Sequence, residues 1–393
     1  MILLSYNEIG LKKDNRWYFE KKLMENIRRM TAHLGLKRIE NLHKKFLLEY
    51  PPEFEDQAIV YLQRIYGIHR LHKAFLFGLD QNEAFEDELF RQMELFLARR
   101  SKANQSFKVE TKRINKNFPR TSVDFSSDLG GRILDRFPGL KVDIHQPDFT
   151  VYCEIYSEFM VFAMEEYPGP GGLPSGTGGE GLLLISGGID SPVAGWLTAK
   201  RGLRINAIHF LSPPHTSPLL PQKIRQLCEQ LALYQNKSMD LYLVSITPFI
   251  VTMMQQAPRE YLTLFQRRVM LRLAARQAKS IGAHALITGD NLGQVASQTI
   301  ENIAAQEGAS EGLPIIRPLI TYEKYQIIQI ARQIETYPIS IQPIEDCCSL
   351  FVPRHPVLRA YPKIIRDYDP LVCDETMIQT ALESIEKIEI RLD

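Results

Sequence analysis

The second half of the chain alternates short apolar runs with longer stretches in which apolar residues recur every three or four positions. Short runs of this kind predict buried strands, and the periodic stretches predict helices. The expected strands are 182–185, 205–210, 241–246 and 285–288, and the expected helices are 192–201, 221–233 and 259–279. This alternation predicts a doubly wound α/β domain with a parallel sheet, in which ligands bind beyond the carboxyl ends of the strands.

The first half shows mixed periodicities without regular alternation, which favours an α+β architecture. The expected helices are 17–34 and 82–100, and the expected strands are 46–50, 75–77, 107–111 and 150–155. Segment 167–181, which is rich in Gly and Pro, separates the two halves. This composition interrupts regular structure, so we expect a domain boundary or an ordered crossover there.

Composition and charge exclude several classes of protein. The 393 residues are 45% hydrophobic and 24% charged, which is typical of a globular protein and not of a disordered or collagen-like one. Because 47 Lys and Arg balance 46 Asp and Glu, a polyanionic partner has to be bound by local basic patches. One such patch runs from Lys102 to Arg120 and interleaves basic residues with Phe107 and Phe118. This pattern suits contact with RNA phosphates.

The cysteines and the start of the chain indicate a cytoplasmic protein. The five cysteines form no CxxC pair and have no Cys/His spacing that would bind a metal ion. The first residues lack the basic and apolar regions of a signal peptide, and no apolar run is long enough to cross a membrane. We therefore predict no membrane association and no metal site built from protein ligands alone.

The clearest chemical signal follows the first strand of the second half. Residues 186–191, with the sequence SGGIDS, connect that strand to a helix that opens with Pro192. Glycines let main-chain N–H groups approach an anion, serine hydroxyls add donors, and the helix N-terminus adds partial positive charge. An ordinary strand-to-helix turn could also contain Gly-Gly-x-Asp, but the complete motif in this context favours a phosphate site. Asp190 would repel a phosphate chain unless Mg²⁺ lies between them.

The sequence SGGIDSPVAGW resembles the PP-loop of ATP pyrophosphatases, in the form found in tRNA 4-thiouridine synthetases. Other segments resemble the same family in order and spacing: 207–210 (AIHF), Arg267-Arg268, 287–299 (ITGDNLGQVASQT), 315–320 (IIRPLI) and 345–353 (EDCCSLFVP). Residues 107–134 resemble a THUMP domain, and the region before residue 55 resembles the ferredoxin-like domain that accompanies it. The resemblance covers essentially the whole chain. It implies a ferredoxin-like domain (1–55), a THUMP RNA-binding domain (56–166), a linker (167–181) and a PP-loop ATP pyrophosphatase domain (182–393).

The resemblance also implies a reaction. ATP adenylates O4 of a uridine near the tRNA elbow, position 8, and releases pyrophosphate; a cysteine persulfide then delivers sulfur to C4 and AMP leaves, which gives 4-thiouridine. ATP with Mg²⁺ is the implied cofactor. Asp190 would bind the metal or orient the nucleotide, Cys347 would carry the sulfur, and Cys348 would be its neighbour or resolving partner.

Two further sets of residues are implied by the resemblance or by the basic patch. The residues expected to bind ATP are Leu184, Ile185, Ser186, Gly187, Gly188, Ser191, His209, Phe210, Arg267, Gly289 and Gln298. The residues expected to bind RNA are Lys108, Lys112, Arg113, Lys116 and Arg120. Taken singly, a buried histidine or a helical arginine is often structural, so the ATP set depends on its members following consecutive strands of one sheet.

The partners implied by the resemblance are tRNA, a cysteine desulfurase as sulfur donor and the sulfur carrier protein of thiamine biosynthesis. We also expect a homodimer. Longer members of the family carry a rhodanese domain, and this sequence reaches Asp393 without one, so we expect sulfur to pass directly to the cysteine pair. The usual Tyr-Gly-Glu turn near the start is replaced by Tyr6-Asn7-Glu8.

Two alternative functions remain compatible with parts of the sequence. The same loop could activate another base or a carboxylate for attack by nitrogen, but Cys347 and Cys348 argue against this alternative. An RNA-binding protein that only binds ATP is the other alternative, and Asp190 together with the cysteine pair argues against it.

Overall fold

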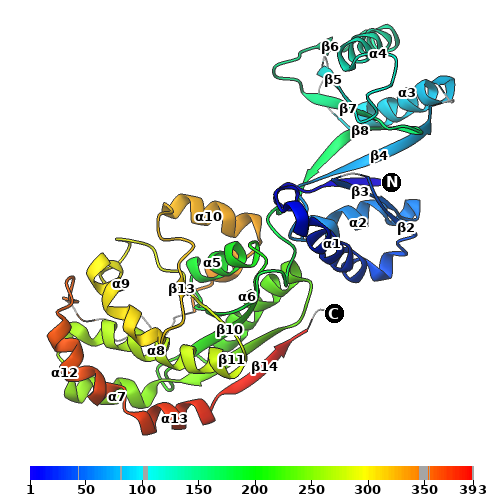
Figure 1. Ribbon diagram of the computed structural model, residues 1–393. Coiled ribbons are helices and arrows are strands. Elements are labelled where there is room, and N and C mark those ends of the chain that lie inside the picture. The colour runs from blue at the N-terminus through cyan, green and yellow to red at the C-terminus, as the bar shows by residue number, and fades with distance from the viewer. Residues whose placement is uncertain (43, 80–81, 101–104, 345–352, 354, 392–393) are drawn as a thin grey trace. The chain divides into compact units, whose positions relative to one another are not determined.

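The computed structural model describes all residues except 43, 80–81, 101–104, 345–352, 354 and 392–393 (Figure 1). The described chain forms two compact units. Unit 1 consists of Met1–Lys13, Ile27–Gln63 and Ile68–Gly171, and unit 2 consists of Asp14–Asn26, Arg64–Gly67 and Gly172–Asp393. The main transition between them falls within the Gly- and Pro-rich segment 167–181.

Unit 1 contains one eight-stranded sheet with the strand order β2-β3-β1-β4-β8-β7-β5-β6. Its strands are β1 (Ile2–Ser5), β2 (Arg38–Asn41), β3 (Lys45–Glu49), β4 (Arg70–Gly78), β5 (Ser106–Arg113), β6 (Lys141–Val142), β7 (Phe149–Ile155) and β8 (Phe159–Pro168). The pairs β5–β6 and β5–β7 are parallel and the others are antiparallel. Because β4 pairs with β1 on one side and β8 on the other, the sheet continues through the regions expected to be ferredoxin-like and THUMP.

The helices associated with this half of the chain are α1 (Arg16–Met30), α2 (Glu55–Leu62), α3 (Asn82–Ala98) and α4 (Ser122–Arg136). The predicted helices 17–34 and 82–100 correspond to α1 and α3. Helix α4 was not predicted, because its SSDLGG stretch has weak helix propensity. Its N-terminus is stabilised by Thr121, whose hydroxyl accepts a hydrogen bond from the main-chain N–H of Asp124 at 3.1 Å.

Unit 2 contains a six-stranded sheet with the strand order β13-β12-β9-β10-β11-β14. Its strands are β9 (Glu180–Leu184), β10 (Arg204–Leu211), β11 (Met239–Ser245), β12 (Leu286–Ile287), β13 (Ile315–Ile316) and β14 (Glu386–Ile390). All neighbours are parallel except β11 and β14. The four strands predicted from apolar runs are β9, β10, β11 and β12, so the doubly wound α/β prediction describes this unit well.

Helices cover both faces of the sheet in unit 2 (Figure 1). One face is covered by α5 (Asp190–Ala199), α6 (Leu220–Gln235), α10 (Lys324–Gln333) and α11 (Tyr337–Ser340), and the other by α7 (Thr247–Gln256), α8 (Leu262–Ser280), α12 (Pro362–Val372) and α13 (Glu375–Glu383). Helix α9 (Ile300–Glu307) follows the loop after β12. Consecutive residues of β9 face opposite cores: Leu182 belongs to the α8 side and Leu183 to the α5 side.

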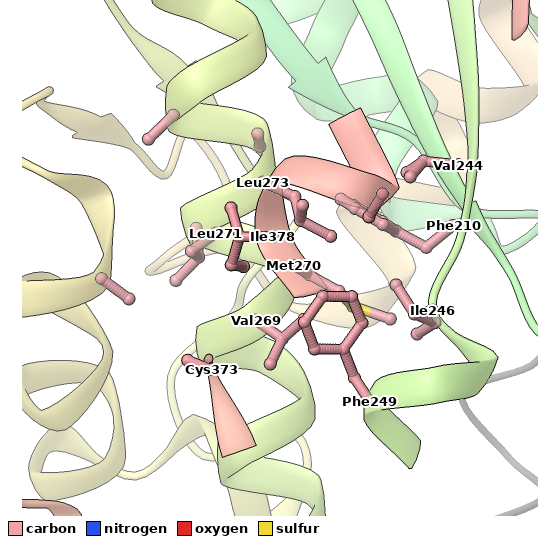
Figure 2. Close-up of a cluster of buried hydrophobic side chains, with 14 of the residues drawn as sticks. Phe210, Val244, Ile246, Phe249, Val269, Met270, Leu271, Leu273, Cys373 and Ile378 are labelled. Carbon is pink, nitrogen blue, oxygen red and sulfur yellow. The ribbon is translucent and has the colours of Figure 1, made fainter. Parts of the chain in front are cut away.

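The core on the α8 side joins distant parts of the sequence. Figure 2 shows side chains of β10, β11, α7, α8 and the α12–α13 region packed into one apolar cluster, including Phe210, Val244, Ile246, Phe249, Val269, Met270, Leu271, Leu273, Cys373 and Ile378. A buried ion pair fixes α12 to α8, because Arg268 binds both carboxylate oxygens of Asp369 at 2.7 and 2.8 Å. This packing holds Phe210 and Met270 at the end of the sheet where ligands are expected.

Candidate nucleotide site and RNA-binding face

The loop Ser186–Ser191 is held in shape by its own hydroxyl groups. The Ser191 hydroxyl accepts a hydrogen bond from the main-chain N–H of Ser186 at 2.8 Å, and its oxygen lies 3.1 Å from the Ser186 hydroxyl oxygen. The Ser186 hydroxyl also accepts from the N–H of Gly188 at 3.4 Å. Since α5 begins at Asp190, its N-terminus opens at the loop, as an anion site requires.

The loop borders a pocket at the carboxyl ends of β9, β10 and β12. The residues that line this pocket are Leu184, Ile185, Ser186, Asp190, Ser191, His209, Phe210, Arg267, Met270, Thr288, Gly289, Asp290 and Gln298. The structure therefore brings Asp190 and nine of the eleven residues expected to bind ATP to one cavity. The other two, Gly187 and Gly188, belong to the loop but are not among the lining residues. Met270, Thr288 and Asp290 were missed by the sequence analysis.

Asp290 is the centre of a charged network in this pocket. Its carboxylate accepts from Arg267 at 2.6 Å, from the Thr288 hydroxyl at 2.7 Å and from Arg317 at 3.4 Å. Gln298 Nε2 is 3.4 Å from the same carboxylate. Burial favours a higher pKa for Asp290, but Arg267, Thr288 and Arg317 outweigh it and the pKa is lowered. Asp290 is therefore ionised and fixes Arg267 at the pocket.

Asp190 is paired with a lysine that the sequence analysis did not identify. Lys324, at the start of α10, donates to Asp190 Oδ1 at 2.6 Å, and Gln294 Nε2 lies 3.4 Å from Oδ2. Lys324 is 134 residues away in the sequence and stands in an ordinary amphipathic helix, so no local signal could have identified it. The contact nevertheless shows that a cation is accommodated beside this carboxylate.

Gly289 has a steric reason to be glycine. A Cβ atom at this position would lie 2.8 Å from Ser191 N and 3.0 Å from the carbonyl carbon of Asp190. Real Cβ atoms essentially never make a contact as short as 2.8 Å, and neither main-chain atom can move aside without moving the loop. Gly289 thus allows the chain after β12 to approach the loop Ser186–Ser191 closely.

The cysteines divide into two groups. Cys347 and Cys348 lie outside the residues that the structure describes. The other three are buried: burial raises the pKa of Cys153 and of Cys373 to about 12, and it also raises the pKa of Cys228. These three thiols are protonated at neutral pH and are poor nucleophiles.

The residues expected to bind RNA do not share one face of unit 1. On β5, Lys108 and Lys112 alternate with Phe107 and Val109, whose side chains belong to the core beneath α3 and α4. Lys112 is exposed, and Lys108 forms an ion pair with Glu110 at 2.9 Å.

The remaining three residues of this set lie at the end of β5 and in the following loop. Arg113 lies on the face opposite to Lys112 and donates to the carbonyl oxygens of Phe118 and Arg120 at 3.1 and 2.8 Å. It therefore organises the loop. Arg120 pairs with Asp128 at 2.9 Å, and Lys116 is exposed in the loop.

A hollow on the Lys112 face of the sheet contains further basic groups that the sequence analysis missed. Its lining includes Lys45, His69, Arg70, His72 and Tyr152. Arg70 and the Tyr152 hydroxyl both bind the Glu166 carboxylate, at 3.2 and 3.0 Å, and the rings of His72 and Tyr152 are 4.8 Å apart. These residues lie on β3, at or just before the start of β4, and on β7, so only the folded sheet gathers them.

Comparisons with known proteins agree along the whole chain. The family model "Thiamine biosynthesis protein (ThiI)" matches residues 176–372, a THUMP domain model matches 83–163, and a ThiI ferredoxin-like domain model matches 1–71. A probable tRNA sulfurtransferase from Alkaliphilus metalliredigens is 38% identical over 393 residues, covering 100% of this chain and 99% of its own length. The chain belongs to the tRNA sulfurtransferase family.

Other relatives agree with this assignment. A probable tRNA sulfurtransferase from Moorella thermoacetica is 39% identical over 389 residues, which cover 99% of this chain and 96% of that protein. A solved 4-thiouridine synthetase, in complex with RNA and with bound ATP, is 34% identical with a TM-score of 0.86 and 99% coverage of both chains. The predicted family and fold class are confirmed: ferredoxin-like and THUMP regions followed by the α/β domain of this family.

Two further properties of this tRNA sulfurtransferase family member concern metals and membranes. Among the described residues, no three or more His, Cys, Asp or Glu side chains are grouped so that they could hold a metal ion. No helix in the described ranges has both the length and the apolar character needed to span a bilayer.

Proposed function

We propose that this protein uses ATP to activate a uridine of tRNA, at position 8 near the elbow, and replaces O4 of the base with sulfur from a cysteine persulfide. The observation that carries the proposal is the pocket at the ends of β9, β10 and β12. There a hydroxyl-rich loop, a helix N-terminus and Asp190 meet Arg267 and the Asp290 network.

Each part of the pocket suits one part of ATP. The loop Ser186–Ser191 and the N-terminus of α5 would hold the phosphates that leave as pyrophosphate. Phe210 and Met270 offer apolar surface for the adenine ring. Gln298 Oε1 is buried and has no hydrogen-bond partner among the described atoms, so it is available to accept from the adenine amino group.

Asp190 supplies the oxygen ligand that a Mg²⁺ ion bound to ATP would use. A carboxylate oxygen suits this hard cation, and the Lys324 ammonium at 2.6 Å already places positive charge at that oxygen. A Mg²⁺ ion bound with the nucleotide would neutralise charge on the triphosphate. Asp190 would hold that ion, and Lys324, whose ammonium lies 2.6 Å from Asp190 Oδ1, would contact the phosphates.

The proposed chemistry proceeds in three balanced steps. O4 of the uracil attacks the α-phosphorus of ATP, the bond to pyrophosphate breaks, and an adenylated uridine forms. The terminal sulfur of a Cys347 persulfide then attacks C4 and AMP leaves with the former O4. Cys348 attacks Cys347 Sγ, the S–S bond to the transferred sulfur breaks with its electron pair on that sulfur, and 4-thiouridine and a Cys347–Cys348 disulfide result. A thiol reductant restores the pair.

The pair at 347–348 is proposed to carry the sulfur because of what surrounds the other thiols, and the resemblance to the family selects Cys347 within that pair. The described cysteines are buried and their pKa values are raised, which leaves the pair at 347–348 for nucleophilic chemistry. A cysteine desulfurase is the proposed source of the persulfide sulfur. The ThiI description of the matching family supports a second acceptor, the sulfur carrier protein of thiamine biosynthesis, and a homodimer remains part of the proposal.

The tRNA is proposed to bind the Lys112 face of unit 1. Lys108, Lys112, Lys45 and Arg70 can neutralise phosphates there, and the rings of His72 and Tyr152 offer stacking surface for bases. Lys116 and Arg120 would extend this contact through the loop that Arg113 holds in shape.

A single substitution tests the ATP site. Asp190→Asn keeps the size of the side chain but removes its charge, so uridine-dependent pyrophosphate release should fall by about two orders of magnitude or more. Asp367→Asn, which changes an exposed residue of α12, is the matched control and should retain full activity. Wild-type rates from Asp190→Asn would remove Asp190 from the reaction.

A further inference from the structure

The ammonium group of Lys223 is buried beside the loop Ser186–Ser191 and has no role in the site described so far. Lys223 lies in the first turn of α6, and only 3% of the residue is exposed. A Cβ atom built on Gly187 would lie 3.5 Å from its Nζ atom. A buried ammonium is costly unless acceptors surround it, so its position requires specific partners.

Those partners lie at the end of α11 and in the chain just after it. Lys223 Nζ donates to the carbonyl oxygen of Ser340 at 2.9 Å and to that of Gln342 at 3.1 Å. The Ser340 hydroxyl donates to the carbonyl oxygen of Gly188 at 3.2 Å. Residues 340–342 are thus joined to the loop Ser186–Ser191 by the Ser340 hydroxyl, and they are also held by the Lys223 ammonium, which lies beside Gly187 of that loop.

This attachment lies close in sequence to the proposed sulfur carrier. Ile344 packs against the apolar core on the α5 side, and Gln342 precedes Cys347 by five residues. Lysine suits this place because one ammonium group has three donors on a long flexible stem and can hold two carbonyl groups at once.

We propose that Lys223 is a positioning residue that keeps residues 340–344 in place beside the loop Ser186–Ser191, so that adenylation and sulfur transfer occur on the same uridine. The proposal rests on the function proposed above. It predicts that losing the ammonium uncouples the two steps: ATP is still consumed, but the adenylated uridine is hydrolysed to uridine and AMP before sulfur arrives.

The test measures 4-thiouridine formed per pyrophosphate released, with tRNA, Mg-ATP, cysteine and a cysteine desulfurase. Lys223→Met preserves the length of the side chain without the charge. We expect pyrophosphate release within about threefold of wild type and a product ratio lower by about tenfold or more, as the loss of a charge-assisted hydrogen bond would cause. Lys237→Met, an exposed lysine just beyond the same helix, should leave both quantities unchanged.

A role limited to stability gives a different result, because fewer folded molecules lower both quantities in proportion. A proportional loss, or an unchanged ratio, overturns the proposal. If Lys223→Met does not fold, the Ser340→Ala variant is used instead. Removal of the hydroxyl that binds Gly188 should lower the ratio of 4-thiouridine to pyrophosphate by about threefold. An unchanged ratio contradicts the proposal. Absence of 4-thiouridine with the wild-type protein would refute the proposed function itself, separately from the role of Lys223.

Discussion

At the scale of single residues, the proposed nucleotide site contains two carboxylates in different environments. Asp190 stands at a helix N-terminus and is bound by Lys324, whereas Asp290 is buried and bound by Arg267, Thr288 and Arg317. The Asp190 carboxylate is therefore suited to bind another cation in place of the Lys324 ammonium. Asp290 is suited to hold Arg267 in one place.

The lowered pKa of Asp290 predicts a specific pH dependence. The ordinary pKa of the carboxyl is 3.8 and its pKa in the folded protein is lower, so its ionised form stabilises the fold at neutral pH. This contribution is present above about pH 4 and is lost as the pH falls through the folded-state pKa. Asp290→Asn should therefore lower the urea midpoint of unfolding at pH 6, and its difference from wild type should shrink towards pH 3. A difference that grows on acidification would contradict the ion-pair account; Asp367→Asn is the exposed control.

At the scale of elements, the site is made by close contact between the loop after β9 and the chain after β12. The sequence predicted both strands, because apolar runs signal buried strands wherever they occur. It did not reveal that Lys324 pairs with Asp190, or that Arg267, Thr288 and Arg317 all bind Asp290. Those contacts depend on how α10 and the chain after β12 and β13 meet the loop, which periodicity does not encode.

Gly289 provides the prediction at this scale. Gly289→Ala should weaken ATP binding by about tenfold or more and destabilise unit 2 by about 1–3 kcal/mol, because the new methyl group meets main-chain atoms of Ser191 and Asp190. Gly308→Ala is a matched control, since the nearest atom to its Cβ is 4.0 Å away. Isothermal titration with ATP and thermal unfolding measure the two effects. Equal behaviour of the two variants would show that the close approach is not required.

At the scale of the whole molecule, a nearly neutral chain gathers Lys45, Arg70 and Lys112 around one hollow of the sheet in unit 1, where Lys45 and Arg70 are paired with glutamates. The sequence indicated the basic stretch after residue 102, but it could not tell which side chains of β5 share a face with Lys45, Arg70 and His72. These residues come from strands that are distant in the sequence. Nor could it show that Arg113 turns inwards and supports the loop.

Salt dependence separates these roles. Lys112→Gln should weaken tRNA binding and reduce the slope of log affinity against log salt by about 0.7–0.9, the value for one phosphate contact. Arg113→Gln should reduce affinity through the loop while the slope changes less. Filter binding between about 50 and 200 mM salt gives both slopes, with Lys237→Gln as control. If Lys112→Gln leaves the slope unchanged, Lys112 does not contact a phosphate.

The most direct test of the account is to identify the products of one reaction. Unmodified tRNA is incubated with the protein, Mg-ATP, cysteine and a cysteine desulfurase, and the digested nucleosides are analysed by mass spectrometry alongside pyrophosphate release. We predict ATP-dependent 4-thiouridine with the wild-type protein, and pyrophosphate release without 4-thiouridine with Cys347→Ser. Undiminished 4-thiouridine from Cys347→Ser, or none from folded wild-type protein, would contradict the account.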